Sequence, residues 1–155
     1  MIALLQRVDR ADVEVGSARI AEIGRGIAAL IGVQRGDNEA SAQRLLDRIA
    51  SYRLFSDDDG RMNLSIKDVA GDLLLVPQFT LAADTRKGTR AGFSSAAQPE
   101  EAERLFNHLV VLARTLPLDI GTGRFGADMR VSLTNNGPVT FWLEVKPDGG
   151  TKRDN

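Results

Sequence analysis

Apolar and polar residues alternate at residues 11–15 and 139–145, a pattern that predicts β-strands, and several further segments are mainly apolar. The segment from Ile27 to Val33 differs, because its residues are apolar almost without interruption. Such a run is typical of a strand that is covered on both faces. The strands predicted in this way are residues 2–8, 11–15 (followed by a turn at Gly16-Ser17 and a partner strand ending near Ile23), 27–33, 73–81, 131–134 and 139–145.

Two segments instead have helical spacing of their apolar residues. The first begins after Asp37-Asn38, and the second opens with Pro99, a residue favoured at the first position of a helix. Glu100 and Glu101 then face the positive end of the helix dipole, and Pro117 ends the segment. The apolar positions are Ala42, Leu45, Leu46 and Ile49 in the first helix, and Ala102, Leu105, Phe106, Leu109, Leu112 and Ala113 in the second.

Strands that outnumber single intervening helices predict a mixed α/β fold of the α+β-like kind. We expect one three-layer α/β/β domain, with mixed sheets and two main helices, over residues 1–145. The chain of 155 residues suits a single core, and it contains no repeat or linker. Residues 146–155 are rich in Gly, Lys and Asp and are predicted to form a disordered tail.

Composition narrows the possible chemistry. The chain has no cysteine, which excludes disulfides, thiolate catalysis and cysteine-based zinc sites. Its opening apolar run is broken at Arg7, too early for a signal peptide, and no stretch is long enough to span a membrane, so we expect a cytoplasmic protein. The net charge of −1 gives no overall attraction for a polyanion. The densest local basic segment is Arg86-Lys87-Gly88-Thr89-Arg90, which could equally be solvated surface.

Side chains for acid–base or metal chemistry are scarce. The one histidine, His108, lies mid-helix, where a surface or core-margin position is commoner than a role as base. No Gly-x-Ser-x-Gly elbow, metal-binding His pair or phosphate loop occurs. The acidic loop at residues 57–60 does not fit a calcium loop and predicts a turn. An enzyme built on this chain would therefore depend on main-chain groups or on its own substrate, without metal or cofactor.

Two segments remain unusual. Residues 77–81, Pro-Gln-Phe-Thr-Leu, end an apolar stretch with polar Gln78 and Thr80 at the same parity. This pattern fits either a site or a strand whose outer face is polar. Residues 135–140, Asn-Asn-Gly-Pro-Val-Thr, join two predicted strands, and Asn, Gly and Pro are common in turns.

At these two segments the chain resembles the D-aminoacyl-tRNA deacylase family, whose motifs read Ser-Gln-Phe-Thr and Asn-x-Gly-Pro-x-Thr. The resemblance extends in order from Met1 to about Val145. One departure is Pro77, which stands where the family has serine and so lacks both an N–H and a hydroxyl. Ala82, where relatives often have a bulkier residue, is a smaller one. Supporting matches lie at residues 6–8, 61–65, 83–88 and 122–129.

The resemblance implies a homodimer that acts on aminoacyl-tRNA, with active sites at the subunit interface. The Gly137-Pro138 bond is expected to be cis, and its carbonyls to face the substrate ammonium group in the partner's pocket. A D side chain would then point to solvent and an L side chain would clash, while glycine, including glycine mischarged on the alanine tRNA, would be cleaved. The implied catalytic residues are Gln78, Phe79 and Thr80. The implied residues for substrate binding and chiral selection are Arg7, Pro77, Phe125, Met129, Gly137 and Pro138. Arg86, Lys87 and Arg90 are predicted to contact the acceptor stem of the tRNA.

For the chemistry, we expect the 2′-hydroxyl of the terminal adenosine to assist water, and main-chain N–H groups near Phe79 and Thr80 to stabilise the oxyanion. Thr80 as a covalent nucleophile is the rival mechanism, and it lacks a visible base. Three other functions stay open: a tRNA-end binding module whose site Pro77 has spoiled, a hydrolase of another small ester or amide, and a structural dimerisation protein.

Overall fold

A long first strand organises the sheet, because β1 pairs with β2, β3 and β8 in the computed structural model, which describes residues 1–147. Two α-helices and a short 3₁₀ helix, η1, complete the described chain. The elements are β1 (Ile2–Val15), β2 (Ala18–Ile23), β3 (Gly26–Gly32), α1 (Glu39–Ser51), β4 (Phe55–Ser56), β5 (Met62–Leu64), β6 (Asp72–Pro77), η1 (Phe79–Ala82), α2 (Pro99–Ala113), β7 (Ile120–Thr122) and β8 (Met129–Glu144).

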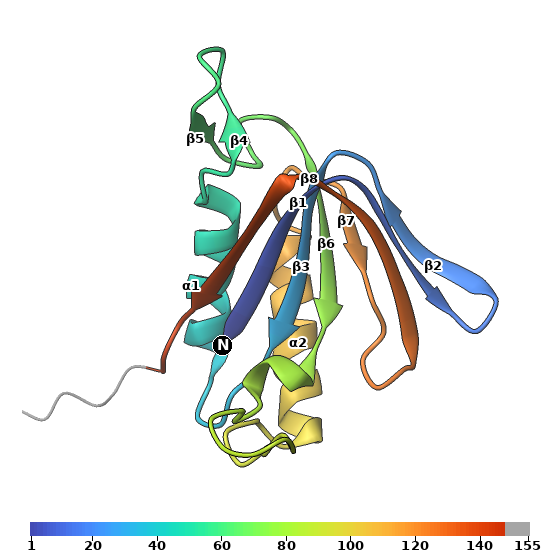
Figure 1. The fold of residues 1–155 in the computed structure, drawn as a ribbon, viewed down its shortest axis with the longest axis vertical. Helices are drawn as coiled ribbons and strands as arrows, with labels where there is room; N and C mark the ends of the chain where they lie inside the picture. The colour runs from blue at the N-terminus through green and yellow to red at the C-terminus, as the bar shows by residue number, and fades with distance from the viewer. Residues whose placement is uncertain (148–155) are drawn as a thin grey trace, which may run out of the picture.

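The main sheet has six strands in the order β2-β1-β3-β6-β7, with β8 on the free side of β1. β3, β6 and β7 are parallel neighbours, whereas β1 is antiparallel to β2, β3 and β8. The helices α1 and α2 are the crossovers of the parallel part. Two right-handed crossovers that advance in one direction across a sheet place both helices on the same face, and Figure 1 shows α1 and α2 on one side of β3 and β6.

Apolar cores lie on both faces of the central strands, as the continuous run in β3 predicts. Ile27 and Leu73 face the helices and pack with Leu45 and Leu105. Their neighbours Ala28 and Leu74 face the other way, into a second core with Val8, Val13 and Ile23. The distal half of β1, with β2 and the first part of β8, bends over this second core (Figure 1). Helices, central strands and this bent arm make the three predicted layers, and the predicted fold class is confirmed.

Both helices begin where the sequence predicts. The Asn38 side chain accepts a hydrogen bond from the Ser41 backbone at 3.0 Å, and the Ser41 hydroxyl accepts one in return from the Asn38 backbone at 3.3 Å. This reciprocal cap satisfies two donors that the first turn of a helix leaves free. Pro99 is the first residue of α2, which ends at Ala113, four residues before Pro117.

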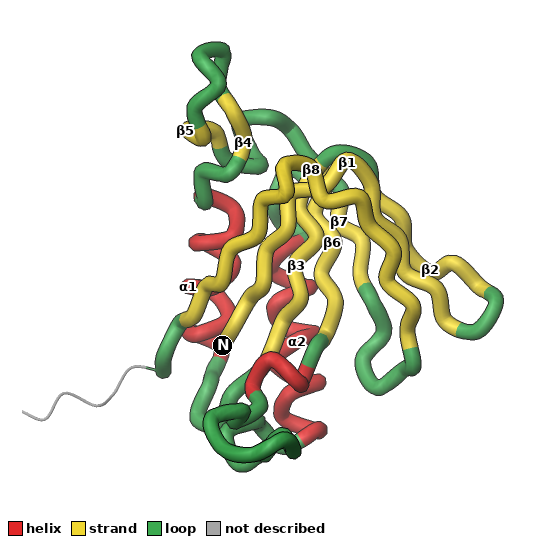
Figure 2. Tube along the Cα trace, viewed as in Figure 1, coloured by secondary structure: helices red, strands yellow, loops and turns green. Residues whose placement is uncertain are grey.

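The last strand differs from the prediction of two strands joined by a turn. β8 is one strand of 16 residues that pairs with β1 both before and after residues 136–139 (Figure 2). Asn135 pairs with Val8 and Thr140 with Gln6, so only Arg7 lies opposite those four residues. The Asn-Gly-Pro segment therefore bulges out of a continuous strand. Sequence periodicity misses this, because the partner of both halves is β1, more than a hundred residues away.

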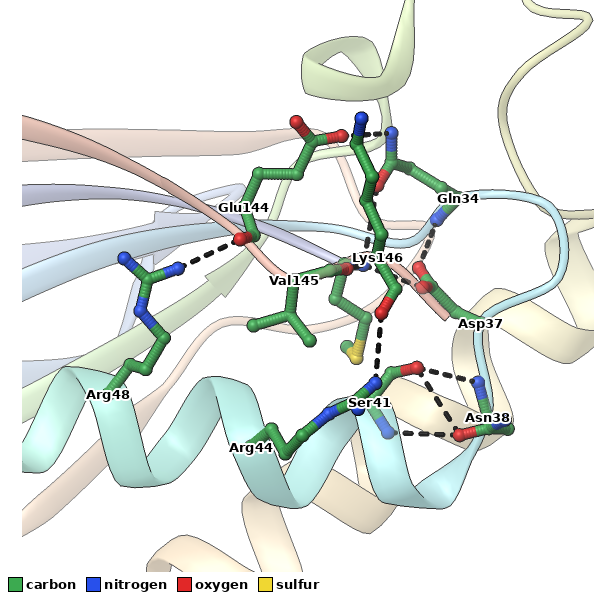
Figure 3. Close-up of polar contacts among 10 residues, drawn as sticks. Gln34, Asp37, Asn38, Ser41, Arg44, Arg48, Glu144, Val145 and Lys146 are labelled. Carbon is green, nitrogen blue, oxygen red and sulfur yellow. Dashed lines mark hydrogen bonds and ion pairs between the residues drawn. The ribbon is translucent and has the colours of Figure 1, made fainter. Parts of the chain in front are cut away.

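The start of the chain is fixed by a buried charge. The Met1 ammonium donates to Asp37 Oδ1 at 2.6 Å, to the Val145 carbonyl at 2.6 Å and to Gln34 Oε1 at 3.3 Å. Figure 3 shows Asp37, Gln34 and Val145 converging at this point. Burial lowers the pKa of the ammonium group, and the hydrogen bond and charge of Asp37 oppose that effect. The contacts tie β1, the end of β8 and the loop before α1 together.

Substituting Asp37 by asparagine should destabilise the fold strongly, because the ammonium group would stay buried without its counter-charge. Breaking one side of a buried ion pair costs about 3–5 kcal/mol. For a domain of this size that corresponds to a fall in Tm of about 6–20 °C. Glu39→Gln is the matched control, since the Glu39–Arg104 pair is exposed and worth at most about 1 kcal/mol. Equal small shifts in thermal denaturation of both variants would contradict the assigned role of Asp37.

The first residues of the predicted tail are described. The Lys146 carbonyl accepts a hydrogen bond from Arg44 at 2.9 Å (Figure 3). The rest of the predicted tail, residues 148–155, lies outside the described part of the chain.

Candidate active site

A cavity of about 460 Å³ lies where β6 ends, between η1, the start of α2 and the β7–β8 loop. This volume falls within the range of small-molecule pockets, about 300–1,000 Å³. It brings together five of the residues that the sequence singled out, from two segments some fifty positions apart. The lining residues are Val76, Pro77, Gln78, Phe79, Ala97, Pro99, Ala102, Phe125, Gly126, Ala127, Met129 and Val131.

The floor of the cavity forms because β6 stops earlier than predicted. The strand ends at Pro77, and Phe79–Ala82 turns into η1, the short helix that follows β6 in Figure 2. The prediction of a strand through Leu81 is therefore wrong. Gln78 still donates its backbone N–H to Ile31 at 2.7 Å, and the chain then folds over the end of β3. Gly32 permits this, since a Cβ there would lie only 2.9 Å from the Cβ of Leu81.

Gln78 and Thr80 do not share one face of a strand, because Thr80 lies in η1, but their side chains are joined directly. The Gln78 side-chain amide donates to the Thr80 hydroxyl in a short hydrogen bond. Among residues 1–147, the backbone N–H groups of Phe79 and Thr80 donate to no protein acceptor. They are the first two of η1, and the opening N–H groups of any helix lack partners within it. Phe79 lines the cavity, whereas Thr80, the next residue in the chain, is not among the lining residues.

The opposite wall comes from the loop that follows β7. Gly123 packs closely there, because a Cβ on it would lie 2.9 Å from the Met129 sulfur and 3.1 Å from Pro77 Cδ. The Met129 sulfur accepts a hydrogen bond from the Arg124 backbone at 3.3 Å. The Phe125 ring packs on Phe106 of α2, with ring centroids 6.5 Å apart. Phe125 and Met129 are thereby held in the cavity wall. Gly123 has a packing role, because its lack of a side chain lets Met129 and Pro77 approach closely.

Among the described residues that line the cavity, none carries an ionisable side chain. His108, half-buried on α2, is not among the lining residues. Any hydrolysis in this cavity must therefore use main-chain groups, amide or hydroxyl side chains, or groups of the substrate.

The Gly137-Pro138 segment lies at the other end of the sheet. Arg7, opposite the bulge, pairs with Ile27, and Ile27 pairs with Leu73. Pro77 is four residues beyond Leu73, or about 13 Å along the strand at ~3.3 Å per residue. One chain therefore does not bring its two motifs together. The Gly137-Pro138 bond is cis, as the resemblance implies.

Hydrogen bonds hold the bulge firmly. Arg7 Nε donates to the Asn136 carbonyl at 3.0 Å, and its NH1 group donates to the Leu54 carbonyl at 2.9 Å. Asn135 Oδ1 accepts from the Val139 backbone at 2.9 Å, and Asn135 Nδ2 donates to Thr140 at 2.9 Å. The guanidinium of Arg7 is thus committed to positioning the bulge within its own chain, far from the cavity.

The predicted tRNA contacts lie on a separate loop, where Arg86, Lys87 and Arg90 line a second hollow with Asp84. Arg86 forms a bidentate pair with Asp84, at 2.9 Å from Nε to Oδ1 and 2.7 Å from NH2 to Oδ2. This hydrogen bonding lowers the pKa of the Asp84 carboxyl and raises the pKa of Arg86. Arg86 is therefore partly neutralised, and within the described chain the positive charge of the loop rests on Lys87 and Arg90.

The acidic loop forms the predicted turn. Asp57 Oδ1 accepts from the backbones of Asp59 at 3.0 Å and Arg61 at 2.9 Å, and Asp57 Oδ2 accepts from Asn63 at 2.8 Å. These hydrogen bonds lower the pKa of the Asp57 carboxyl, and the bond from the Asn63 side chain has the largest effect. Within residues 1–147 we find no group of three or more His, Cys, Asp or Glu side chains placed to hold a metal ion. In the same range, no helix is long and apolar enough to cross a membrane.

Sequence reasoning missed most of the small residues that line the cavity. Ala97, Ala102 and Ala127 have no chemistry that marks them, and Gly126 resembles any loop glycine. Gly126 and Ala127 lie within the family match at residues 122–129 and Ala102 is a predicted apolar helix position, but only the topology, which brings the start of α2 beside the β7–β8 loop, places them in the cavity.

Comparison with known proteins identifies the family of the chain. A family model described as D-Tyr-tRNA(Tyr) deacylase matches residues 4–144. A D-aminoacyl-tRNA deacylase of Thioalkalivibrio sulfidiphilus is 64% identical over 147 residues, which cover 95% of this chain and 99% of that protein. One of Vibrio cholerae is 57% identical over 94% of this chain and its own whole length.

Two solved structures share the fold. One, titled c-Myc DNA Unwinding Element Binding Protein, has a TM-score of 0.89 and 38% identity, covering 94% of this chain and 99% of that one. The other, titled as a probable eukaryotic D-amino acid tRNA deacylase, has a TM-score of 0.76 and 16% identity, covering 93% and 98%, and supports the fold alone. The fold is mixed α/β, the relatives' names define the class as hydrolases, and no cavity-lining residue among residues 1–147 has an ionisable side chain. The chain belongs to the D-aminoacyl-tRNA deacylase family.

Proposed function

We propose that this protein hydrolyses the ester of D-aminoacyl-tRNA and releases the free D-amino acid and the tRNA. The observation that carries this proposal is the cavity at the end of β6, where the lining residue Phe79 and its neighbour Thr80 have unpaired backbone N–H groups and where no lining residue among residues 1–147 has an ionisable side chain. An aminoacyl ester is already activated, so it suits such a site better than an amide would. Family membership, with relatives named D-aminoacyl-tRNA deacylase over nearly the whole chain, supports the same reaction. The cytoplasm, where tRNA is charged, is the compartment that this substrate requires.

The working unit in this proposal is a homodimer. The bulge at residues 136–139 cannot reach the cavity of its own chain, but a two-fold partner can present it to the neighbouring cavity. A partly exposed apolar stripe on the sheet face opposite the helices supports such a contact, in which Trp142 is exposed and Leu4 and Leu30 are half-buried. Trp142, 52% exposed, pairs with Leu4, and Leu4 pairs with Leu30. Exposed apolar residues that adjoin in this way are typical of interaction surfaces.

Chiral selection would follow from the rigidity of the bulge. If its carbonyl oxygens accept from the substrate ammonium and the ester is held at η1, only one direction remains for the side chain. A D side chain then points to solvent, and an L side chain meets the backbone of Gly137 and Pro138. Rejection by clash does not depend on which D-residue is attached. Glycine has no side chain to reject, so glycyl-tRNA, including glycine mischarged on the alanine tRNA, should also be cleaved.

For the chemical step, we place the developing oxyanion at the N–H groups of Phe79 and Thr80. Main-chain donors fixed before the reaction are effective there, because they need no reorganisation when charge develops. The 2′-hydroxyl of the terminal adenosine assists the attack of water, and Phe125 and Met129 hold the adenosine. Pro77 closes one side of this pocket with a ring, in place of the hydroxyl that the family's serine would supply.

Replacing Thr80 by alanine should leave turnover nearly unchanged, because the proposed donor is its backbone N–H. The Thr80 hydroxyl already accepts from Gln78, and no base lines the cavity to activate it. Single-turnover deacylation of D-tyrosyl-tRNA measures the effect. Complete loss of activity would instead favour Thr80 as a covalent nucleophile. As a companion test, a tRNA ending in 2′-deoxyadenosine should react poorly with the unmodified protein.

The proposed function itself is tested by incubating the purified protein with matched D- and L-tyrosyl-tRNA. Release of D-tyrosine with L-tyrosyl-tRNA spared is the expected result. Binding of both without release would identify a tRNA-end binding module, and cleavage of free D-amino-acid esters alone would identify a hydrolase of another small ester. A dimer with neither property would be a structural protein.

A further inference from the structure

An exposed pair of aromatic rings continues the surface of the cavity. Phe79 lines the cavity and is 59% exposed, and Phe93 is 44% exposed. Their ring centroids are 5.2 Å apart, and the planes are tilted by 44°. Exposed large apolar side chains that pack on each other, rather than being scattered singly, often belong to an interaction surface. The pair therefore indicates a surface that another molecule covers.

The segment that carries Phe93 is held firmly. The Asp84 and Gly92 backbones exchange two hydrogen bonds, at 2.7 and 3.0 Å. The Ser95 hydroxyl donates to the Ala82 carbonyl at 2.5 Å, and the Ser95 carbonyl accepts from the Arg35 backbone at 2.9 Å. Phe93 thus stands on a braced segment between the cavity and the basic loop.

The basic loop begins immediately beyond the ring pair. The Asp84–Gly92 bridge encloses Arg86, Lys87 and Arg90, all exposed. Three positive charges and the one negative charge of Asp84 leave a net local charge of about +2 in a chain whose total is −1. This loop is therefore a local exception in a chain that otherwise gives a polyanion no attraction.

We propose that Phe93, with Lys87 and Arg90, binds the single-stranded nucleotides that precede the terminal adenosine of the tRNA. The inference rests on the proposed function, which places the terminal nucleoside in the cavity beside Phe79. Single-stranded RNA ends are bound by aromatic rings that stack on bases and by cations that meet phosphates. The order cavity, Phe79, Phe93, basic loop matches a strand leaving the cavity one nucleotide at a time. Charge complementarity favours this occupant over a second copy of the chain.

The test compares two substrates that differ only in the nucleotides concerned. Phe93→Ala should lower kcat/KM for D-tyrosyl-tRNA by about 5- to 150-fold, the equivalent of one lost base stack of about 1–3 kcal/mol. For D-tyrosyl-adenosine, which has no preceding nucleotide, kcat/KM should not change. Phe93→Tyr, which keeps a stacking ring, should retain activity on both. Met62→Ala is the matched control, because Met62 is 46% exposed on a distant hairpin.

Other outcomes of this comparison separate the remaining possibilities. An equal loss of kcat/KM on both substrates would place Phe93 in the cavity, and an unchanged kcat/KM on both would leave Phe93 without a role. Either result would overturn the proposal. Dissociation of the dimer by Phe93→Ala, measured by sedimentation, would make the ring a subunit contact and overturn it as well. If the unmodified protein cleaves neither substrate, the proposed function fails. Weaker binding of an uncharged CCA-ended RNA hairpin to Phe93→Ala would then still support the RNA surface.

The charged part of the surface is tested by salt dependence. Lys87→Gln combined with Arg90→Gln should flatten the slope of log K against log salt for that hairpin by roughly 1.4, at ~0.7 per phosphate contact of a single strand. Arg86→Gln should change it less, because Arg86 is already paired with Asp84. Lys67→Gln, an exposed lysine on the β5–β6 connection, is the control. An unchanged slope in the double variant would overturn the assignment of Lys87 and Arg90.

Discussion

Replacing Gly137 by alanine is expected to reduce deacylation of D-tyrosyl-tRNA by about 100-fold or more. The backbone of Gly137 has φ +136°, a conformation that residues with a side chain rarely adopt. There is also no room, since a Cβ would lie 2.7 Å from Val139 Cγ2, 2.9 Å from the Val139 backbone nitrogen and 3.1 Å from an Arg7 guanidinium nitrogen. The bulge must therefore shift, and misplacing a positioning group by about 1 Å can cost a factor of 10².

The control for this variant is Gly60→Ala. Gly60 also has a positive φ, +77°, but a Cβ there meets nothing within 4 Å. It should lose about 1–2 kcal/mol of stability from backbone strain and keep its activity. If Gly137→Ala stays folded, judged by circular dichroism and Tm, and turns over D-tyrosyl-tRNA as fast as Gly60→Ala does, the bulge has no part in the reaction.

Much of the fold could be predicted because its cues are local. The unbroken apolar run of β3 requires cover on both faces, and two cores provide it. Asn38 and Pro99 define helix starts through their own side chains, and both predictions are confirmed. The alternating residues Val139, Phe141, Leu143 and Val145 face the helix-side core together, as their period of two indicates.

The features of the fold that could not be predicted depend on contacts between residues far apart in the chain. The end of β6 at Pro77 is fixed by how η1 folds over Gly32, and no local pattern of residues 73–81 reveals it. The single strand β8 exists because β1 pairs with both of its halves, so the Asn-Gly-Pro segment bulges where a turn was expected. In each case the local residues permit two structures, and tertiary packing selects one.

The candidate site was predicted only in part. Pro77, Gln78, Phe79, Phe125 and Met129 meet in one cavity, and the resemblance to the deacylase family had named them. The resemblance assigns Arg7 to substrate binding, which stays a prediction, and within one chain the hydrogen bonds of Arg7 go to Asn136 and Leu54. An arginine's partners cannot be read from sequence, because its long side chain reaches many acceptors. Phe93 was missed for a related reason: only its packing on Phe79 distinguishes it from any loop phenylalanine.

The central claim is that each site combines the cavity of one chain with the bulge of another, and mixed dimers test it. Gly137→Ala spoils the bulge and leaves the cavity intact. Ala127→Trp does the reverse, because Ala127 lines the cavity on a surface loop where a bulky ring can fill the space without disturbing the core. Each variant alone should be nearly inactive on D-tyrosyl-tRNA.

Co-expression of the two variants should restore activity. Random pairing makes about half of the dimers mixed, and each mixed dimer has one site with both a normal cavity and a normal bulge. Deacylation of D-tyrosyl-tRNA by the co-expressed mixture should therefore reach about one quarter of the unmodified rate. Activity no higher than the average of the two separate variants, in a mixture shown to contain mixed dimers, would contradict the claim.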